Sequence, residues 1–206
     1  AKQIRLRLAL TSFKHVGVFP EQAVNWDFIY HSVKKLDVVQ PKVLNLFAYT
    51  GAATLAAKVA GADIIHLDSI KQVITWAKEN MTLSGLDNIR WLVEDAMTFV
   101  KREVKRGKKY QGIILDPPAY GHGPNGENWK LEDEINEMLA NVRLLLEENH
   151  FLVLNTYSLG FSSIILDNLL DEHFSKNIKR QTGEIFLQST AGARLPLGVF
   201  ARHCTL

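Results

Sequence analysis

Short apolar runs and longer helical segments alternate along most of this chain, and this alternation constrains the fold more than any other feature of the sequence. Runs of largely apolar residues lie at 43–46, 63–67, 89–93, 112–115 and 151–154. Apolar residues at helical spacing occupy the segments at 52–60, 70–84, 96–106 and 131–147. Strands that are apolar on both faces and alternate with helices are typical of a parallel sheet that helices cover on both sides. The sequence therefore predicts an open α/β sheet.

The C-terminal part of the chain breaks this alternation. After a predicted helix at 163–173, the segments 184–188 and 199–202 have strand character with no helix between them, and 194–198 is predicted as a turn. Two strands joined without a crossover helix must be antiparallel. We therefore predict an α/β, Rossmann-like fold, in which a mostly parallel seven-stranded sheet carries helices on both faces and ends in a C-terminal antiparallel hairpin.

The N-terminal segment precedes the regular pattern. Apolar and polar residues alternate from Ile4 to Leu8, and Gly17 and Pro20 interrupt the segment, which predicts a strand or hairpin over 4–19. Helical spacing from 21 to 36 predicts a helix. We expect residues 1–36 to flank a cofactor site and residues 37–206 to form the cofactor-binding domain.

Composition restricts the classes of function. The 206 residues suffice for one α/β domain, and a net charge of +2 is too small to indicate a nucleic-acid partner by itself. The lone cysteine, Cys204, excludes an internal disulfide and a cysteine-based zinc site, and the histidines are too scattered to predict a metal site. No apolar run approaches the roughly 20 residues that span a membrane. We therefore expect a reducing, cytoplasmic setting and no membrane partner.

The loop after the first parallel strand is where an open α/β sheet binds its ligand. Here residues 47–51 contain one glycine, Gly51, rather than the three of a dinucleotide fingerprint, which argues against NAD or FAD. A ligand without a pyrophosphate, such as S-adenosylmethionine, needs only one close approach to the backbone. The alternative is a plain strand-to-helix turn in which Gly51 supplies a positive φ.

Acidic residues end the next two predicted strands. Asp68, followed by Ser69, lies where a carboxylate can accept hydrogen bonds from two ribose hydroxyls. Asp95, followed by Ala96, lies where a carboxylate can bind an adenine amino group. Each aspartate has the alternative role of a helix N-cap. Ligand-type residues at three successive strand ends favour a cofactor site over three unrelated structural roles.

The loop after the fourth strand holds the most specific motif of the chain, Asp116-Pro117-Pro118, with Tyr120 close behind it. Two prolines fix φ and remove two donors, so we expect carbonyls that point outward as acceptors beside the Asp116 carboxylate. Such acceptors suit the N–H of a planar base, on which Tyr120 can stack. The alternative is a stiff turn without a partner. His122 is a further candidate for a substrate contact, and Trp129 is expected either to close over the substrate or to anchor the loop.

Taken together, these residues resemble the class I S-adenosylmethionine-dependent methyltransferases, and more narrowly the ribosomal RNA large-subunit methyltransferase family that includes the 23S rRNA cytosine-C5 enzyme. The resemblance spans nearly the whole chain and implies S-adenosylmethionine as cofactor and ribosomal RNA as substrate. It assigns cofactor binding to Phe19, Gln22, Phe47, Ala48, Tyr49, Thr50, Gly51, Asp68, Ser69, Asp95 and Ala96, and catalysis to Asp116, Pro117, Pro118 and Tyr120. Members usually carry an RNA-binding domain before the catalytic one, so we expect such a domain to be missing from this chain.

One departure from the family changes the expected chemistry. The cytosine-C5 members place a cysteine just after the fifth strand to attack C6 of the ring, and this chain has Tyr157 there. Cys204 is expected to be a small buried hydrophobe rather than a substitute nucleophile. The sequence therefore disfavours C5 methylation through a covalent adduct and favours transfer to a nitrogen.

Other functions stay open at this point. They are a nicotinamide-dependent oxidoreductase on the same fold, a methyltransferase acting on a protein or a small molecule, and a non-catalytic RNA-binding relative. The basic run at 101–109 fits an RNA contact or a solvated helix end equally well. Neither the modified base nor the oligomeric state follows from the sequence.

Overall fold

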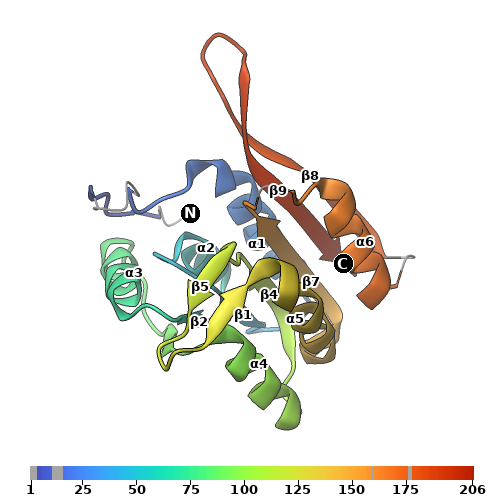
Figure 1. Ribbon diagram of the computed structural model, residues 1–206. Helices are drawn as coiled ribbons and strands as arrows, with labels where there is room; N and C mark the ends of the chain where they lie inside the picture. The colour runs from blue at the N-terminus through green and yellow to red at the C-terminus, as the bar shows by residue number, and fades with distance from the viewer. Residues whose placement is uncertain (1–3, 11–15, 159, 176–177) are drawn as a thin grey trace.

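A seven-stranded sheet with the strand order β3-β2-β1-β4-β7-β9-β8 organises the chain (Figure 1). The computed structural model describes residues 4–10, 16–158, 160–175 and 178–206. Neighbouring strands from β3 to β7 pair in parallel, and β9 is antiparallel to both β7 and β8. The strands are β1 (Lys42–Leu46), β2 (Asp63–Asp68), β3 (Arg90–Val93), β4 (Tyr110–Leu115), β7 (Leu146–Thr156), β8 (Lys179–Gln188) and β9 (Arg194–Cys204). The predicted fold class is confirmed.

Helices cover both faces of this sheet. They are η1 (Pro20–Gln22), α1 (Ala23–Lys35), α2 (Ala52–Ala60), α3 (Lys71–Leu83), α4 (Ala96–Lys105), α5 (Leu131–Leu145) and α6 (Ser163–His173). Along β1, Leu44 and Leu46 pack into the core under α4, α5 and α6, whereas Val43 packs into the core under α1 and α2. Because successive side chains of a strand point to opposite faces, a strand buried on both sides is largely apolar. This explains the short apolar runs of the sequence.

Two local predictions at the carboxyl side of the sheet were wrong. Residues 194–198 belong to β9 rather than to a turn, because the hairpin turns earlier, where Ser189 N donates to Ala193 O at 2.8 Å. The segment between the fourth predicted strand and the helix predicted at 131–147, which we expect to be a loop, contains a small antiparallel sheet of β5 (Tyr120–His122) and β6 (Asn128–Lys130). Both errors have the same cause. The composition of these residues is typical of a turn or a loop, but they form strands because pairing with a neighbouring strand satisfies their backbone N–H and C=O groups.

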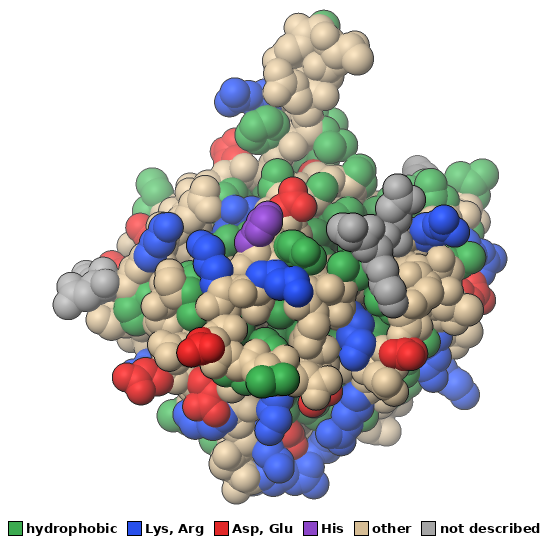
Figure 2. Space-filling view, turned by 180° about the vertical axis from the view of Figure 1, so that it is seen from behind, with side chains coloured by type: hydrophobic (Ala, Val, Ile, Leu, Met, Phe, Trp, Pro, Cys, Tyr) green, Lys and Arg blue, Asp and Glu red, His purple; other side chains and the backbone are tan. Residues whose placement is uncertain are grey.

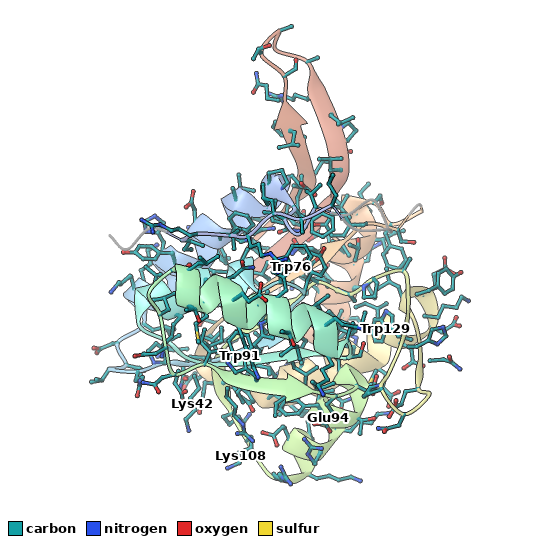
Figure 3. All side chains as sticks on the ribbon, turned by 90° about the vertical axis from the view of Figure 1, so that its left-hand side faces the viewer. Lys42, Trp76, Trp91, Glu94, Lys108 and Trp129 are labelled. Carbon is teal, nitrogen blue, oxygen red and sulfur yellow. The ribbon has the colours of Figure 1, made fainter. Side chains whose placement is uncertain are left out.

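The N-terminal segment differs from its prediction as well. The helix predicted at 21–36 is present as η1 and α1. The described residues 4–10 form no strand, and residues 11–15 of the predicted hairpin lie outside the described part of the chain. Side chains of α3 replace a partner strand, since Asn80 Oδ1 accepts from Arg7 N at 2.8 Å and Trp76 Nε1 donates to Arg7 O at 3.0 Å. Figure 3 shows Trp76 where α3 meets this segment. The division at residue 36 stays a prediction.

No helix in the described part of the chain is both long and apolar enough to cross a bilayer.

Candidate active site

Three adjoining hollows lie at the carboxyl ends of the parallel strands. The inner hollow, of about 50 Å³, lies between η1, α1 and the loop after β1, and the outer hollow, of about 320 Å³, opens beside the loop after β4. The lateral hollow, of about 30 Å³, lies beside Asp95. Phe47 lines all three hollows, and Asp116 lines both the inner and the outer one. Every site residue predicted from the sequence lines at least one of them, so the structure brings the predicted set together.

The loop after β1 holds an unusual backbone conformation. Phe47, Tyr49 and Gly51 have φ angles of 56°, 48° and 89°, all in the left-handed region. A side chain at Gly51 would be strained by that φ and would lie 3.2 Å from Ala77 Cβ. Non-glycine residues adopt positive φ at a cost, and such strain persists only where the surroundings hold it in place. The loop therefore lies against the hollows in a conformation that the rest of the fold imposes.

Buried side chains behind the loop hold it. Thr50 Oγ1 donates to Gly17 O at 2.7 Å, and Asn80 Nδ2 donates to Thr50 O at 2.9 Å. Thr50 thus links the loop by hydrogen bonds to the N-terminal segment and to α3, and it also lines the inner hollow. Beneath the loop, Asn45 Nδ2 donates to Thr54 Oγ1 at 2.9 Å, and the Asn45 Oδ1 atom is buried without a partner in the described part of the chain.

The Asp68 carboxylate accepts hydrogen bonds from the backbone of two loops, the one after β1 and the one after β2. Its Oδ2 accepts from Tyr49 N at 2.9 Å and its Oδ1 accepts from Ile70 N at 3.0 Å. Burial raises the pKa of Asp68, and these backbone hydrogen bonds oppose that rise. The N-cap of α3 is Ile70, so the capping alternative does not describe Asp68. Its carboxylate braces the loop after β1 and borders both the outer and the lateral hollow.

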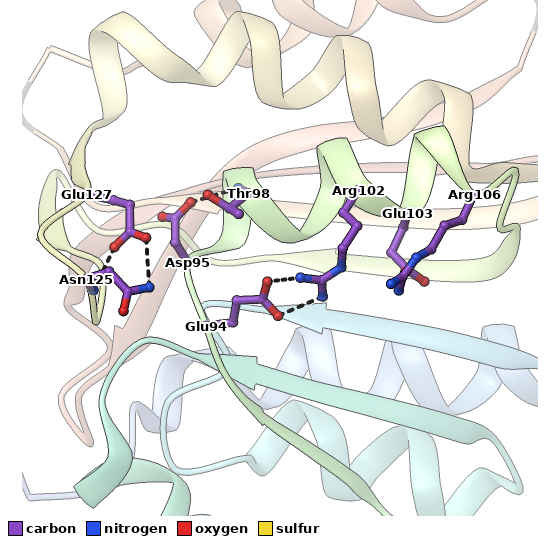
Figure 4. Close-up of polar contacts among 8 residues, drawn as sticks. All are labelled: Glu94, Asp95, Thr98, Arg102, Glu103, Arg106, Asn125 and Glu127. Atoms are coloured by element: carbon purple, nitrogen blue, oxygen red, sulfur yellow. Dashed lines mark hydrogen bonds and ion pairs between the residues drawn. The ribbon is translucent and has the colours of Figure 1, made fainter.

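Asp95 does serve as a helix cap. It is the N-cap of α4, and its Oδ1 accepts from Thr98 N at 2.7 Å (Figure 4). Next to it, Glu94 is held by Arg102, whose Nη2 donates to Glu94 Oε2 at 2.8 Å. Asp95 and Ala96 nonetheless line the lateral hollow. Capping and ligand binding are therefore compatible at this position.

Asp116 carries a buried acceptor where the inner and outer hollows meet. Its Oδ1 is inaccessible to solvent and has no hydrogen-bond partner among the described residues. Burial, and after it the nearby negative charge of Glu21, raise the pKa of Asp116 to about 7, and a hydrogen bond with Asn155 opposes that rise. An unpaired buried carboxylate is costly. Asp116 thus keeps one unsatisfied acceptor at the border of the inner and outer hollows.

A chain of polar side chains lines the cleft next to Asp116. Asn25 Nδ2 donates to Asn155 Oδ1 and to Gln22 Oε1, both at 2.8 Å, and Gln22 donates in turn to the Tyr157 hydroxyl. Arg202 Nε donates to Asn25 Oδ1 at 2.7 Å. These side chains tie η1 and α1 to the ends of β7 and β9. The arrangement fixes Asn155, and through it the position of Asp116.

The proline loop uses one of the carbonyls predicted as outward acceptors, that of Pro118, inside the protein. Pro118 O accepts from Trp129 Nε1 at 2.7 Å, and Ala119 O accepts from Leu131 N at 3.0 Å. Trp129 is 5 % exposed and packs on Phe47 with a centroid distance of 4.8 Å, so it anchors the loop rather than closing over a substrate. Tyr120 is 70 % exposed, as a stacking residue requires, and His122 is bound to Asn128.

Residues 21–170 match the family model described as Conserved hypothetical protein 95. The chain belongs to this family. Among relatives, the ribosomal RNA large subunit methyltransferase K/L of Shewanella frigidimarina is 31% identical over 153 residues, which are 72% of this chain and 20% of the relative. The ribosomal RNA large subunit methyltransferase K of Neisseria meningitidis is 28% identical over 146 residues, or 68% of this chain and 40% of the relative. The chain thus spans well under half of either relative.

Among solved structures, the SAM dependent methyltransferase from Agrobacterium tumefaciens is 40% identical to this chain, with a TM-score of 0.91. The match covers 95% of this chain and 66% of the other. The resemblance to the ribosomal RNA large-subunit methyltransferases, predicted from motifs at the strand ends, is confirmed.

Sequence reasoning missed buried polar residues at and next to the inner hollow in this member of the Conserved hypothetical protein 95 family. Asn25 and Asn155 are 1% and 2% exposed, and Glu21 is 6% exposed, although each lies in a segment predicted only as helix or strand end. Buried amides and acids are rare, because they need partners inside the protein. The one available signal was Asn25, a polar residue at helical spacing among the apolar residues of α1.

Proposed function

We propose that this chain is the catalytic part of an S-adenosylmethionine-dependent methyltransferase that modifies a base of ribosomal RNA at a nitrogen. The observation that carries the proposal is the unpartnered, buried Asp116 Oδ1 at the junction of two hollows. Support comes from the relatives, which are named as ribosomal RNA methyltransferases, and from the similar Agrobacterium structure, which is named as SAM-dependent.

The hollows suit the parts of S-adenosylmethionine. Asn45 lines the inner hollow, and its buried Oδ1, which lacks a partner among the described residues, suits the ammonium group of an amino acid. Phe19, Gln22 and residues 47–51 would surround that end of the cofactor, Asp68 and Ser69 the ribose, and Asp95 and Ala96 the adenine. An oxidoreductase is disfavoured, because the loop after β1 lacks the glycines that a pyrophosphate requires.

The protein's contribution to the reaction is mainly positional. S-adenosylmethionine supplies a methyl group on a sulfonium, so the acceptor nitrogen gives its lone pair to the methyl carbon and the carbon–sulfur bond breaks with its electrons left on sulfur. Asp116 would hold the N–H of the base in line and receive its proton, and Tyr120 would stack on the ring. Such a transfer needs orientation more than a strong base.

The position of Cys204 supports nitrogen rather than C5 as the methylated atom. Cys204 pairs with Phe151 at the beginning of the apolar part of β7, whereas Asn155 and Tyr157, at the other end of that strand, line the cleft. Tyr157 occupies the position at which the C5 enzymes carry their nucleophile, and its phenol carries no thiol chemistry. A ribosomal substrate also fits a cytoplasmic location, which we propose with it.

Mass spectrometry of nucleosides tests this proposal. Ribosomal RNA from a strain that lacks the gene is incubated with the chain and methyl-labelled S-adenosylmethionine, and we expect one N-methylated nucleoside. Asp116→Ala should abolish the label while S-adenosylhomocysteine still binds, and Asp87→Ala, at an exposed aspartate, is the matched control. Full turnover by the Asp116 variant would exclude this mechanism. A label found only in protein or in a small molecule would show that the substrate is not RNA.

A further inference from the structure

A hairpin arm extends from the edge of the sheet beyond the strand that borders the cleft. The pairing of β9 with β7 ends at Val199 and Thr156, but β8 and β9 continue to pair with each other up to Gln188 and Arg194. We define residues 185–198 as the arm. Figures 1 and 2 show it standing clear of the body of the molecule. Because Thr156 is the carboxyl end of β7, the arm projects from the same edge of the sheet as the three hollows.

The base of the arm packs against residues that line the cleft. Ile185 is 2% exposed, and β8 contacts η1, which carries Gln22. A Cβ at Gly198 would lie 2.9 Å from Thr156 O and 3.0 Å from Tyr157 Cδ1, so only glycine lets Tyr157 pack this closely. Tyr157 lines the outer hollow. A substrate that leaves the outer hollow past Tyr157 would therefore pass beside the base of the arm.

The outer part of the arm exposes flat and apolar groups. Phe186, Leu187 and Leu195 are 38%, 37% and 59% exposed. Phe186 pairs with Pro196 and Gln188 with Arg194, which places these residues on one face, while Leu187 and Leu195 pair on the other. The Arg194 guanidinium lies over the Phe186 ring at 4.8 Å. An exposed aromatic ring with a guanidinium stacked on it presents a planar, cationic surface.

We propose that the Phe186–Arg194 pair is a stacking site for an unpaired nucleotide that neighbours the one being methylated. This inference rests on the proposed RNA substrate. Arginine and aromatic planes are the groups on which proteins stack splayed bases, and a cation also attracts the adjacent phosphate. Arg194 is the only charged residue in the arm, so no carboxylate there opposes a phosphate. Tyr120, exposed at the other hairpin of the cleft, would stack the reacting base itself.

The arm's two faces provide matched variants for the test. Phe186→Leu keeps an apolar side chain but removes the aromatic plane, Arg194→Ala removes the stacked cation, and Leu195→Ala alters the opposite face. Affinity is measured by fluorescence anisotropy with a labelled single-stranded oligoribonucleotide of mixed sequence, and KM and kcat are measured with ribosomal RNA. We expect the first two variants to weaken binding and raise KM roughly 5- to 100-fold, with kcat unchanged. Leu195→Ala should behave as the wild type.

Several outcomes would overturn the stacking site. RNA binding by Phe186→Leu at wild-type affinity would exclude stacking on the ring. Loss of binding in Leu195→Ala, or an arm-dependent dimer in sedimentation, would assign the arm to a protein partner or a second copy. S-adenosylhomocysteine affinity, measured by calorimetry, checks that each variant keeps its cofactor site. If the wild type methylates RNA and the arm variants do so equally well, this inference fails alone. A wild type that labels no RNA at all would instead remove the proposed function.

Discussion

Asp116 shows how one residue type acquires its chemistry from its surroundings. A solvated aspartate is ionised at neutral pH, but burial and the nearby Glu21 raise the pKa of Asp116 to about 7 in the absence of ligand. Glu21 is itself buried, and its pKa is raised by that burial. A cationic cofactor beside them would favour the charged form of Asp116. The proposed acceptor is therefore neutral or charged depending on pH and on what is bound.

The raised pKa of Asp116 predicts that both activity and stability depend on pH. Because the acceptor role requires the carboxylate, kcat/KM for RNA should rise as pH increases through about 7 in the free enzyme. Asp116→Asn should lower kcat/KM by roughly 100-fold or more and remove this rising limb. A second readout is stability. Since the pKa is raised on folding, the folded state holds the extra proton between about pH 4 and 7, so this group makes the fold less stable as pH rises through that window.

The asparagine variant separates the two effects. It should be more stable than the wild type at pH 8 and gain little at pH 4, as measured by denaturant unfolding at both pH values. A rising limb that persists unchanged in Asp116→Asn would assign the titration to another group.

At the scale of elements, the contact between Trp129 and the proline loop joins β6 to the active site. Trp129 donates to Pro118 O and packs on Phe47, so one side chain holds the loop after β4 against the loop after β1. The prolines stiffen their loop locally, but this hydrogen bond sets where the stiff loop lies. The small sheet of β5 and β6 carries both Tyr120, which lines the outer hollow, and Trp129, which lines the lateral one.

Trp129→Phe tests this positioning role. The variant keeps an aromatic ring against Phe47 and removes the Nε1–H donor, so the free energy of unfolding should fall by about 1 kcal/mol. We expect kcat to fall about 10-fold, since the loop loses its fixed position, while S-adenosylhomocysteine affinity changes less than about 2-fold. Trp91→Phe, on β3 beside His66, is the control. Equal kcat for both variants would show that the hydrogen bond does not position the loop.

At the scale of the whole molecule, buried histidines make the fold sensitive to acid. His203 is 0% exposed, packs between His150 and Phe174, and has no hydrogen-bond partner for either ring nitrogen among the described residues. Burial lowers the pKa of His203 to about 4, and that of His66 to about 3. Because the unfolded chain binds protons that the fold excludes, the titration of these residues costs the fold no stability above about pH 6.5, and the free energy of unfolding decreases as pH falls from there toward 4.

His203→Phe should remove part of this sensitivity. The free energy of unfolding should rise by about 1 kcal/mol at pH 7, because two buried ring nitrogens without partners are replaced by a ring of similar shape. Its decrease between pH 6.5 and 4 should become shallower. His203→Gln is the matched control, since it removes the titration but keeps a buried polar group, and it should flatten the slope without the gain at pH 7. Urea unfolding across this pH range measures both; a slope identical to the wild type in both variants would contradict the assignment.

The sequence by itself determined the sheet, its crossover helices and the residues gathered at its carboxyl edge. Periodicity of 2 and 3.6 residues is a local property, and parallel strands separated by helices must bring their ends to one edge, so Asp68, Asp95 and Asp116 were bound to converge. The single glycine and the prolines also act within their own loops.

Only the tertiary structure decided which groups are paired. Asn25 meets Asn155 across 130 positions of sequence, and Pro118 O is taken by Trp129 rather than left for a substrate. The positive φ of Phe47 and Tyr49, the length of the arm and the free oxygen of Asp116 likewise depend on distant neighbours. Burial and hydrogen-bond partners arise from long-range packing, which local patterns do not encode. For that reason the sequence located the cleft, and the structure showed which of its atoms remain available for chemistry.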